Sequence, residues 1–460
     1  MPGNTILSRF TAFLLLLLLL TLAGCGGDDA SPPPAVKLIS FTNYSSVNAE
    51  NILSIMEAQN AQELLISDSL GGYGTVAAAN AAASPGSPPA QSLIDLFREL
   101  YNAFKLSVRY IPVPLKIVYT IPGYDKKLTG LLVYPYTFRK MPILSLQHPT
   151  QVERKYSPSF HKMTDNELTT QYALLLASMG YIVVVPDYPG LGDNTDVHPY
   201  CMNTLADSVV GMIEVVKGMQ GITPQDGRLF LMGYSEGGYA TLVTARKIQE
   251  KKPGLNLVAA AALDGPHSLS RTMHDVMINA GKEYRAPYFL PYVIAGYGAG
   301  YPSIPEFTFG TAIHDDPPGF AAQLYRMLDG DYTGGEISNY MMGLPGYHGP
   351  SSALTDSFLT LLKTEGSIVN AKLRENDSYA WTPDGKAKIR IWHNTKDDLV
   401  PVGNTENAAA AWKGVANVET IYFSEYIDGL GSVHAGALIP AYIKATGWIN
   451  GMAFPYGNGE

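Results

Sequence analysis

Arg228-Leu-Phe-Leu-Met-Gly-Tyr-Ser-Glu-Gly237 is the stretch of sequence that decides the fold of this chain. The apolar run through Met232 is typical of a buried strand, and the residues from Gly238 to Lys252 have a helical pattern. Glycines stand two residues before and two residues after Ser235, where a strand and a helix would pack too closely for a Cβ atom. The pattern therefore predicts a sharp strand-to-helix turn that exposes a nucleophilic Ser235.

Apolar strands alternate with helices on both sides of this turn. Near-continuous apolar strands separated by helices are typical of a mostly parallel sheet with helices on both faces, joined by right-handed crossovers. We therefore predict an α/β fold. The expected strands cover residues 117–121, 128–134, 143–147, 181–186, 229–234, 257–263, 389–393 and 418–423. The expected helices cover residues 167–179, 202–219, 238–252, 406–413 and 434–449.

About 120 residues, between strands that end near Asp264 and begin near Lys388, interrupt this alternation. A structureless loop of that length is improbable inside a compact domain, so residues 266–386 are expected to form an inserted cap. Residues 321–328 and 352–363 are its candidate helices. Its many aromatic and apolar side chains could line a pocket for an apolar ligand. The alternative is a packing insertion far from any site.

The first 24 residues have the pattern of an export signal. Arg9 precedes an apolar stretch over residues 13–22, which is too short to span a membrane as a helix. The ending Leu22-Ala-Gly-Cys25 resembles the lipobox of bacterial lipoproteins, which implies cleavage before Cys25, lipidation of its sulfur and stable membrane anchoring. The residue after that cysteine is Gly26, and in this position the chain resembles lipoproteins that are sorted to an outer membrane. The resemblance implies a location at the bacterial cell envelope, whereas the alternative is a secreted protein with a coincidental cysteine.

The composition bounds the remaining organisation. With 460 residues, of which 46% are hydrophobic, the chain can bury a large core. Residues 25–92 include proline-, alanine- and serine-rich tracts and are expected to form a tether with one helix over 48–67, which leaves 93–460 as the folded domain. The net charge of −9 and the lack of a basic stripe exclude a nucleic-acid partner. Cys201 has no intrachain partner once Cys25 is lipidated, and is interpreted as a small buried hydrophobe.

A nucleophilic serine needs a base and an acid that orients this base. In sheets that carry this turn, the chain order is serine, then aspartate or glutamate, then histidine. The strand 389–393 leads into a loop with Asp397 and Asp398, at the carboxyl end of a strand, where sites of open α/β sheets lie. His434 is the only histidine after them. We therefore predict Ser235, His434 and one of the two aspartates as a catalytic triad, against the alternative of a surface histidine at a helix cap.

Three further segments resemble those of a known family. His393-Asn-Thr-Lys-Asp-Asp-Leu-Val-Pro401 resembles the acid-bearing loop of α/β-hydrolases, with Asn394 in place of the usual glycine, and this resemblance implies Asp397 as the acid, with Asp398 solvated. Leu144-Ser-Leu-Gln-His-Pro-Thr-Gln151 resembles the strand-end loop that supplies an oxyanion donor, and residues 180–192 are similar to the segment preceding the turn in secretory lipases. Over residues 128–451 the chain is thus similar to the secretory lipase-like group.

The resemblance implies a mechanism that uses the side chains of the triad and two backbone donors. Ser235 attacks a carbonyl, His434 takes its proton, and Asp397 holds the imidazole ring. The N–H groups of Glu236 and of Thr150 or Gln151 would stabilise the oxyanion, because Pro149 has no N–H.

No metal or organic cofactor is expected in this mechanism. One segment, Gly192-Asp-Asn-Thr-Asp-Val-His198, carries the donors of a hard-cation site. We interpret it instead as a solvated polar loop. His148 and His393 have no zinc spacing.

Three functions fit these observations. The first is a serine carboxylic-ester hydrolase, a lipase or esterase, acting on small-molecule or lipid esters. The second is a serine peptidase or amidase of the same fold, since a triad and an oxyanion hole serve both acyl groups. The third is a binding protein of the envelope without catalysis. The complete predicted triad argues against the third, and the lack of a propeller repeat favours esters over peptides.

The lipid anchor can be tested by changing its attachment site. We expect Cys25→Ala to move the protein from the membrane fraction to the soluble fraction, because the acyl chains that hold it would no longer be attached. Fractionation of cells followed by immunoblotting measures this, with the wild-type chain as control. Unchanged partitioning of the variant would refute the anchor.

Overall fold

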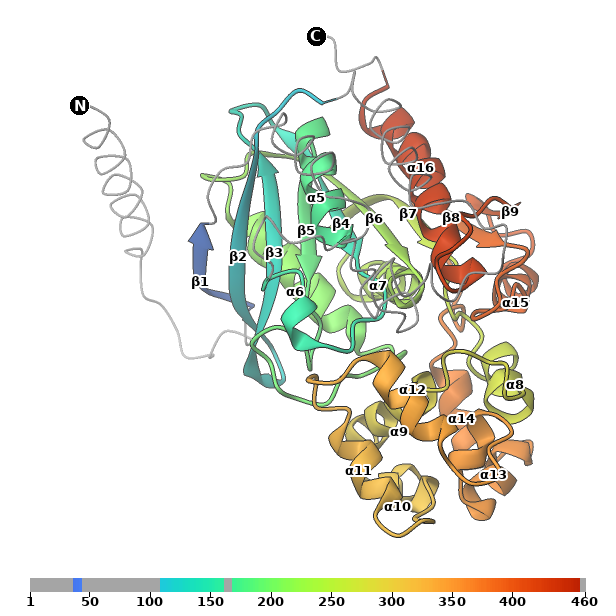
Figure 1. The fold of residues 1–460 in the computed structure, drawn as a ribbon. Coiled ribbons are helices and arrows are strands. Elements are labelled where there is room, and N and C mark those ends of the chain that lie inside the picture. The colour runs from blue at the N-terminus through green and yellow to red at the C-terminus, as the bar shows by residue number, and fades with distance from the viewer. Residues whose placement is uncertain (1–35, 44–107, 161–167, 456–460) are drawn as a thin grey trace, which may run out of the picture. The chain divides into compact units, whose positions relative to one another are not determined.

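The computed structural model of the protein describes residues 36–43, 108–160 and 168–455. The expected signal, the anchor at Cys25 and the expected helix over 48–67 lie outside the described residues. A sheet of nine strands forms the centre of the described part (Figure 1). Its strands are β1 (Lys37–Asn43), β2 (Pro112–Ile121), β3 (Tyr124–Pro135), β4 (Met141–Gln147), β5 (Ile182–Pro186), β6 (Gln225–Tyr234), β7 (Asn256–Leu263), β8 (Lys388–Asn394) and β9 (Val418–Phe423).

The strand order is β1-β2-β3-β5-β4-β6-β7-β8-β9. The first four strands in this order pair antiparallel, and the six strands from β5 to β9 are mutually parallel. Successive residues of β6 point to opposite faces: Leu229 and Leu231 join one buried apolar cluster, and Phe230 and Met232 join the other. Apolar side chains on both faces require cover on both faces. The predicted α/β architecture with a mostly parallel sheet is confirmed.

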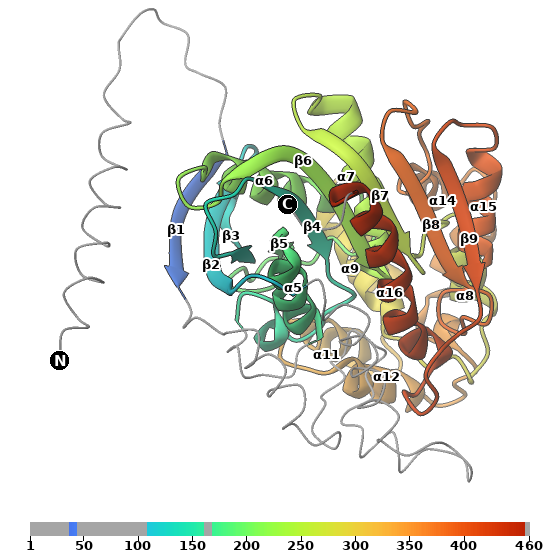
Figure 2. The ribbon, with the colours of Figure 1, turned by 90° about the horizontal axis from the view of Figure 1, so that it is seen from above.

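Helices supply that cover (Figure 2). One face is packed by α5 (Leu168–Met179) and α16 (Val433–Ala453), and the other by α6 (Leu205–Gly218) and α7 (Glu236–Lys251). A further helix, α15 (Gly403–Ala411), packs beside β8 and β9. These five helices correspond to the five expected from the sequence. Within the described part of the chain, no helix is long and apolar enough to cross a membrane.

Strand β1 is an addition to the predicted fold. It lies at the edge of the sheet and pairs antiparallel with β2, with Phe41 opposite Ile117. The tether expected over residues 25–92 is therefore interrupted, because residues 37–43 belong to the sheet. A strand at the edge of a sheet buries few side chains and so need not show the apolar pattern by which the other strands were predicted. Ile39 and Phe41 of this strand are both exposed.

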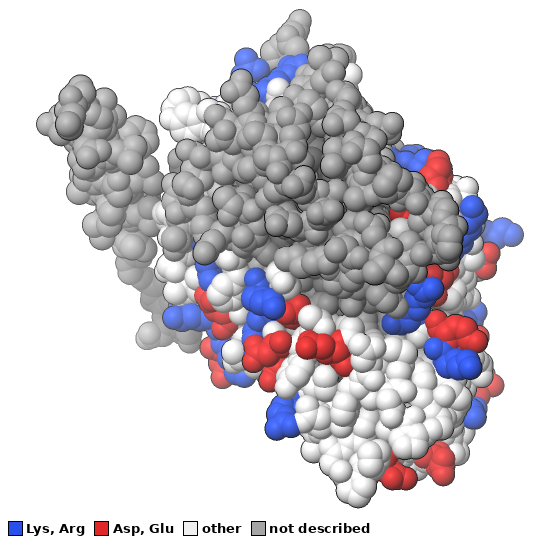
Figure 3. Space-filling model, in the orientation of Figure 1, with Lys and Arg blue, Asp and Glu red and all other residues white. Residues whose placement is uncertain are grey.

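Seven helices follow β7 before the chain returns to the sheet as β8. They lie together beside the ends of the parallel strands (Figure 1), and their buried residues belong to the same apolar cluster as those of α6 and α7. In the view of Figure 3, the surface over the middle of this group is mostly uncharged. Two of the large apolar side chains of these helices, Tyr325 and Met342, are exposed. The helices are α8 (Thr272–Asn279), α9 (Phe289–Gly300), α10 (Phe309–Ala312), α11 (Phe320–Arg326), α12 (Gly334–Met342), α13 (Asp356–Lys363) and α14 (Ile368–Glu375).

Candidate active site

Ser235 lies on the turn between β6 and α7, in a conformation that few residues adopt. Its φ is 57° and its ψ is −123°, and its N–H donates to the carbonyl of Leu263 at 2.8 Å. A Cβ atom on Gly233 would lie 2.3 Å from the carbonyl oxygen of Gly237, and one on Gly237 would lie 2.1 Å from that of Gln147. Only glycine fits at either position. The strained serine is therefore held by the close packing of β6, α7 and the end of β4.

The other two residues of the predicted triad meet Ser235 at the carboxyl ends of the parallel strands. The Nε2 atom of His434 lies 2.9 Å from Ser235 Oγ, and its Nδ1 atom lies 2.6 Å from Asp397 Oδ2. Ser235 is 3% exposed and His434 is 1% exposed. Because the Asp397 carboxylate can only accept, Nδ1 carries the ring proton and Nε2 can accept the proton of the serine hydroxyl. This is the arrangement that activates a serine for attack on a carbonyl carbon.

Asp397 and Asp398 differ in what they contact. The Oδ1 atom of Asp397 accepts the N–H groups of Leu399 at 3.0 Å and Val400 at 2.8 Å, so its carboxylate is oriented toward the imidazole. Asp398 is exposed, and its Oδ1 accepts the backbone N–H of His434 at 3.1 Å. The two aspartates thus engage the ring and the backbone of the same histidine, and only Asp397 reaches the ring.

The backbone of His434 is fixed from a second side. Tyr234, next to the serine, donates its hydroxyl hydrogen to the carbonyl oxygen of His434 at 2.5 Å. Ser432 caps α16 by accepting the N–H of Ala435 at 3.0 Å. Nothing in the sequence spacing indicated the role of Tyr234.

The predicted oxyanion donors lie beside the turn. The N–H of Glu236 opens α7 and so has no acceptor inside that helix. Thr150 is buried in the loop after β4, and its Oγ1 lies 3.1 Å from the hydroxyl of Tyr200. Gln151 is also buried, and within the described residues neither polar atom of its side chain has a partner. A helix N-terminus and a strand-end loop thus border the serine on one side.

The side chain of Glu236 is buried in an ion pair that sequence reasoning missed. Its Oε1 lies 2.7 Å from Nε2 of His198, whose Nδ1 lies 2.8 Å from the carbonyl oxygen of Pro189. Burial works against a charged His198, but the carboxylate of Glu236 outweighs it and the pKa of His198 is raised above its ordinary value. The N–H of Glu236 thus belongs to a residue whose side chain is fixed.

The polar loop before α6 is only partly the solvated loop that we expected, because Asp193 is exposed whereas His198 is buried. His198 is buried against Glu236, while Asp193 pairs with Lys116 and Asp196 pairs with Lys126. The three donors of the loop therefore face different partners and do not converge on a cation.

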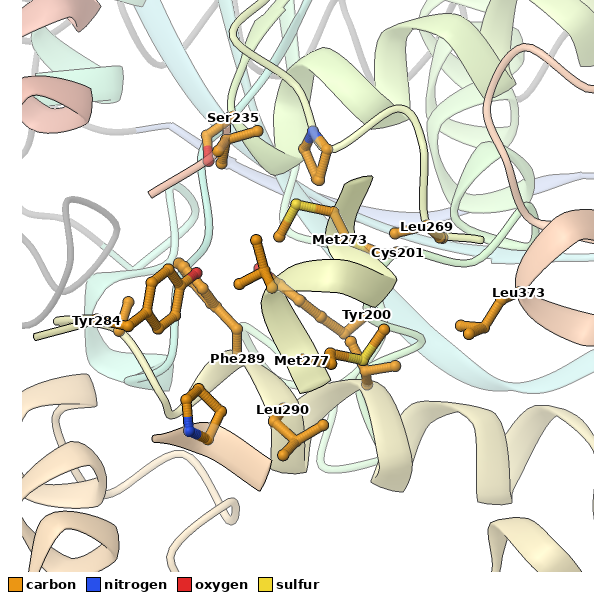
Figure 4. A pocket seen from close by; sticks show the side chains of 16 residues that line it. Tyr200, Cys201, Ser235, Leu269, Met273, Met277, Tyr284, Phe289, Leu290 and Leu373 are labelled. Atoms are coloured by element: carbon orange, nitrogen blue, oxygen red, sulfur yellow. The ribbon is translucent and has the colours of Figure 1, made fainter. Parts of the chain in front are cut away.

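A pocket with mostly apolar walls opens onto Ser235 (Figure 4). The space that it outlines, about 580 Å³, includes solvent-open space at its mouth. Ser235 lies at its top in the figure, and Met277 and Leu290 lie toward its lower end. Cys201 in its wall is buried, and burial raises the pKa of its thiol, as suits a small apolar residue. The walls come mainly from the loops after β5, β7 and β8 and from α8, α9 and α14.

The chain is similar to known proteins over most of its length. A family model of secretory lipases matches residues 155–451, which is more than half of the chain. The chain belongs to the secretory lipase family. It is an α/β-hydrolase and a carboxylic-ester hydrolase. No curated protein matches the chain.

Solved structures share the fold of this secretory lipase. A candidate hydrolase of Legionella pneumophila has a TM-score of 0.68 at 22% identity, over 90% of this chain and 98% of that chain. The ligand-bound rice cell wall degrading esterase LipA of Xanthomonas oryzae has a TM-score of 0.67 at 18% identity, over 91% of this chain and 98% of that chain. At these identities the likeness is one of fold.

One group of buried side chains in this secretory lipase has the composition of a metal site. Donor atoms of Asp264, His393 and Asp397 lie within 4.8 Å of one another. However, Nε2 of His393 lies 2.8 Å from the carbonyl oxygen of Val400, which can only accept, so this nitrogen carries a proton. Its Nδ1 lies 2.7 Å from Thr405 Oγ1. A protonated nitrogen cannot bind a metal ion, so these residues do not fit one.

The two aspartates of the loop can be separated by substitution. We expect Asp397→Asn to lower kcat by about 10³- to 10⁴-fold, because an amide in this position no longer stabilises the imidazolium of His434. Asp398→Asn keeps an oxygen that can accept the backbone N–H, and kcat should stay within about threefold of wild type. Steady-state hydrolysis of a chromogenic ester measures both variants. The opposite ranking would assign the acid to Asp398.

Proposed function

We propose that this secretory lipase cleaves carboxylic esters through an acyl-enzyme, with Ser235 as nucleophile, His434 as general base and acid, and Asp397 as the acid that orients the imidazole. The observation that carries the proposal is the unbroken chain of contacts Asp397–His434–Ser235, at 2.6 and 2.9 Å. Attack by Ser235 Oγ transfers its proton to Nε2 of His434, which then protonates the leaving alcohol. Water repeats these steps to release the acid.

The oxyanion of each tetrahedral intermediate would accept the N–H of Glu236 and one N–H from Thr150 or Gln151. Each such donor contributes about 3 kcal/mol in comparable sites. The ion pair between Glu236 and His198 supports this role for Glu236, because a fixed side chain restricts reorientation of the adjoining peptide.

The substrate class follows from the pocket. Its walls are mostly apolar and it begins at Ser235, so we propose that it holds the apolar chain of the ester next to the scissile bond. Three of the seven helices between β7 and β8, namely α8, α9 and α14, supply much of this wall, which supports a role for this insertion as a cap that selects the chain. An aminoacyl substrate would need a carboxylate for its charged amino group, and no acidic side chain lines the described pocket.

We further propose that the enzyme is exported and held at the bacterial envelope by a lipid on Cys25. Membership of a secretory family supports the export. The ending Leu22-Ala-Gly-Cys25 supports the lipid. An anchored enzyme of this kind would meet small-molecule or lipid esters near the membrane surface.

Hydrolysis of a graded series of substrates tests the reaction. The chain from residue 26 onward, which keeps β1, and its Ser235→Ala variant are assayed with chromogenic esters of two to sixteen acyl carbons, beside aminoacyl and prolyl anilides. We expect ester cleavage that is lost by at least about 10³-fold in the variant, since the nucleophile is gone. Cleavage of anilides alone would indicate a peptidase. Equal activity of the two proteins would overturn the proposed nucleophile.

The pocket is tested by narrowing it. Met277 of α8 lies in the wall, away from the serine, and we expect Met277→Trp to lower kcat/KM for long acyl chains at least tenfold more than for acetyl esters. Met342→Trp is the matched control, because Met342 is exposed on α12 and outside the pocket wall. If both variants keep the wild-type chain-length profile, the ester chain does not bind in this pocket.

A further inference from the structure

A second buried carboxyl group lies beside the triad and has no part in the mechanism above. Asp264 directly follows β7, the strand next to β8, and is 0% exposed. Its N–H donates to the carbonyl of Trp392 at 2.9 Å, and its φ is 45°. Parallel strands end at one edge of the sheet, so Asp264 and the loop with Asp397 are adjacent. An acidic residue at the end of an apolar strand was the sequence signal that could have revealed it.

The two oxygens of Asp264 are in different situations. Oδ1 accepts the backbone N–H of Asn394 at 2.7 Å, whereas Oδ2 is buried and has no donor among the described residues. The carboxyl groups of Asp264 and Asp397 have oxygens within 4.8 Å of each other. Two buried negative charges this close repel each other, so the arrangement favours a proton on one of the two carboxyl groups, and a protonated carboxyl can donate a hydrogen bond.

The proton belongs to Asp264. Both oxygens of Asp397 already accept hydrogen bonds, from Leu399 and Val400 on one side and from His434 on the other. Asp264 receives a single donor. Burial, together with the negative charge of Asp397, raises the pKa of Asp264 well above its usual range.

Among the residues that the structure describes, none around the two carboxyl groups supplies a cation that could neutralise a second carboxylate. Burial lowers the pKa of His393, and burial together with His393 lowers the pKa of His267 to about 3, so both rings are neutral near pH 7. The proton of His434 Nδ1 is directed at Asp397. The titratable groups around the pair of carboxyls are Tyr234 on β6, His267 after β7, Tyr284 before α9, His393 on β8, Asp398 in the following loop and His434 on α16.

We propose that Asp264 is a positioning residue of the triad: a neutral carboxyl that donates a hydrogen bond from Oδ2 to Asp397 and keeps that carboxylate oriented toward His434. The inference rests on the proposed triad function. During the reaction the proton of Ser235 passes to His434 and then to the leaving alcohol, while Asp264 keeps its own proton. A donor on Asp397 also withdraws charge from it, which limits how strongly Asp397 favours the protonated imidazole at rest.

The pH profile of kcat/KM distinguishes a neutral Asp264 from an ionised one. Asn at this position keeps an oxygen for the N–H of Asn394 and an amide donor for Asp397, and it tolerates a positive φ. In Asp264→Asn we therefore expect the acidic limb of the profile to stay at the wild-type pH. If Asp264 were ionised, this variant would remove a negative charge near His434. The protonated imidazole would then be less stable, and the acidic limb would move to lower pH by about one unit or more. Such a shift of the acidic limb to lower pH would overturn the proposal.

Removal of the donor gives the complementary result. In Asp264→Ala we expect kcat to drop and the acidic limb to move to higher pH, because Asp397 then carries its full charge beside the imidazole. A defect of packing alone would lower activity at every pH and leave the limb in place, which would contradict the proposal. Asp377→Asn is the matched control, since Asp377 is a buried carboxyl bound by Ser270 away from the triad. Should Asp264→Ala fail to fold, Asp264→Asn decides the question.

An infrared measurement separates this inference from the proposed function. The carbonyl stretch of a neutral carboxylic acid should appear in the inactive Ser235→Ala protein at neutral pH, and one such band should disappear in the double variant with Asp264→Asn. The readout does not depend on turnover. Identical spectra would refute a neutral Asp264, whereas full activity of Ser235→Ala would refute the triad function and leave the infrared result intact.

Discussion

The close approach of three backbone segments around Ser235 is the constraint on which the rest of the site depends. Strand β6, helix α7 and the end of β4 come so near that the positions of Gly233 and Gly237 have no room for a side chain. This packing forces the serine into its strained conformation and brings the loop with Thr150 beside the start of α7. It therefore fixes Ser235 relative to the N–H groups that we propose as oxyanion donors before any substrate arrives, which is how a site avoids reorganisation during a reaction.

The electrostatics of the site follow from a scarcity of cations. Asp397, Asp264 and Asp398 gather at the ends of two neighbouring strands, and the buried histidines beside them, His267 and His393, are held neutral. Buried negative charge is thus balanced by backbone N–H groups and by the proton that we propose on Asp264.

Sequence reasoning located the sheet and the three triad candidates because both depend on local patterns. Apolar runs mark the six parallel strands, and glycine spacing marks the turn at Ser235. It missed β1, whose edge position asks little of its side chains, and five of the helices between β7 and β8, whose short amphipathic stretches carry weak periodicity. It also missed the pair of Glu236 and His198, because a partner that is distant along the chain leaves no spacing to read. Asp264 was passed over although it directly follows an apolar strand, because its neighbour Asp397 is equally distant along the chain.

The helices that line the pocket share one apolar core with α6 and α7. A residue such as Met277 therefore belongs at once to the wall of the pocket and to the packing that supports the sheet. Changes of substrate range and changes of folding stability cannot be made independently at such positions. When a lineage of these enzymes adapts to new esters, the resulting loss of stability must be compensated elsewhere in the core. Its sequences should therefore show paired substitutions, one among the helices between β7 and β8 and one in the packing of the sheet.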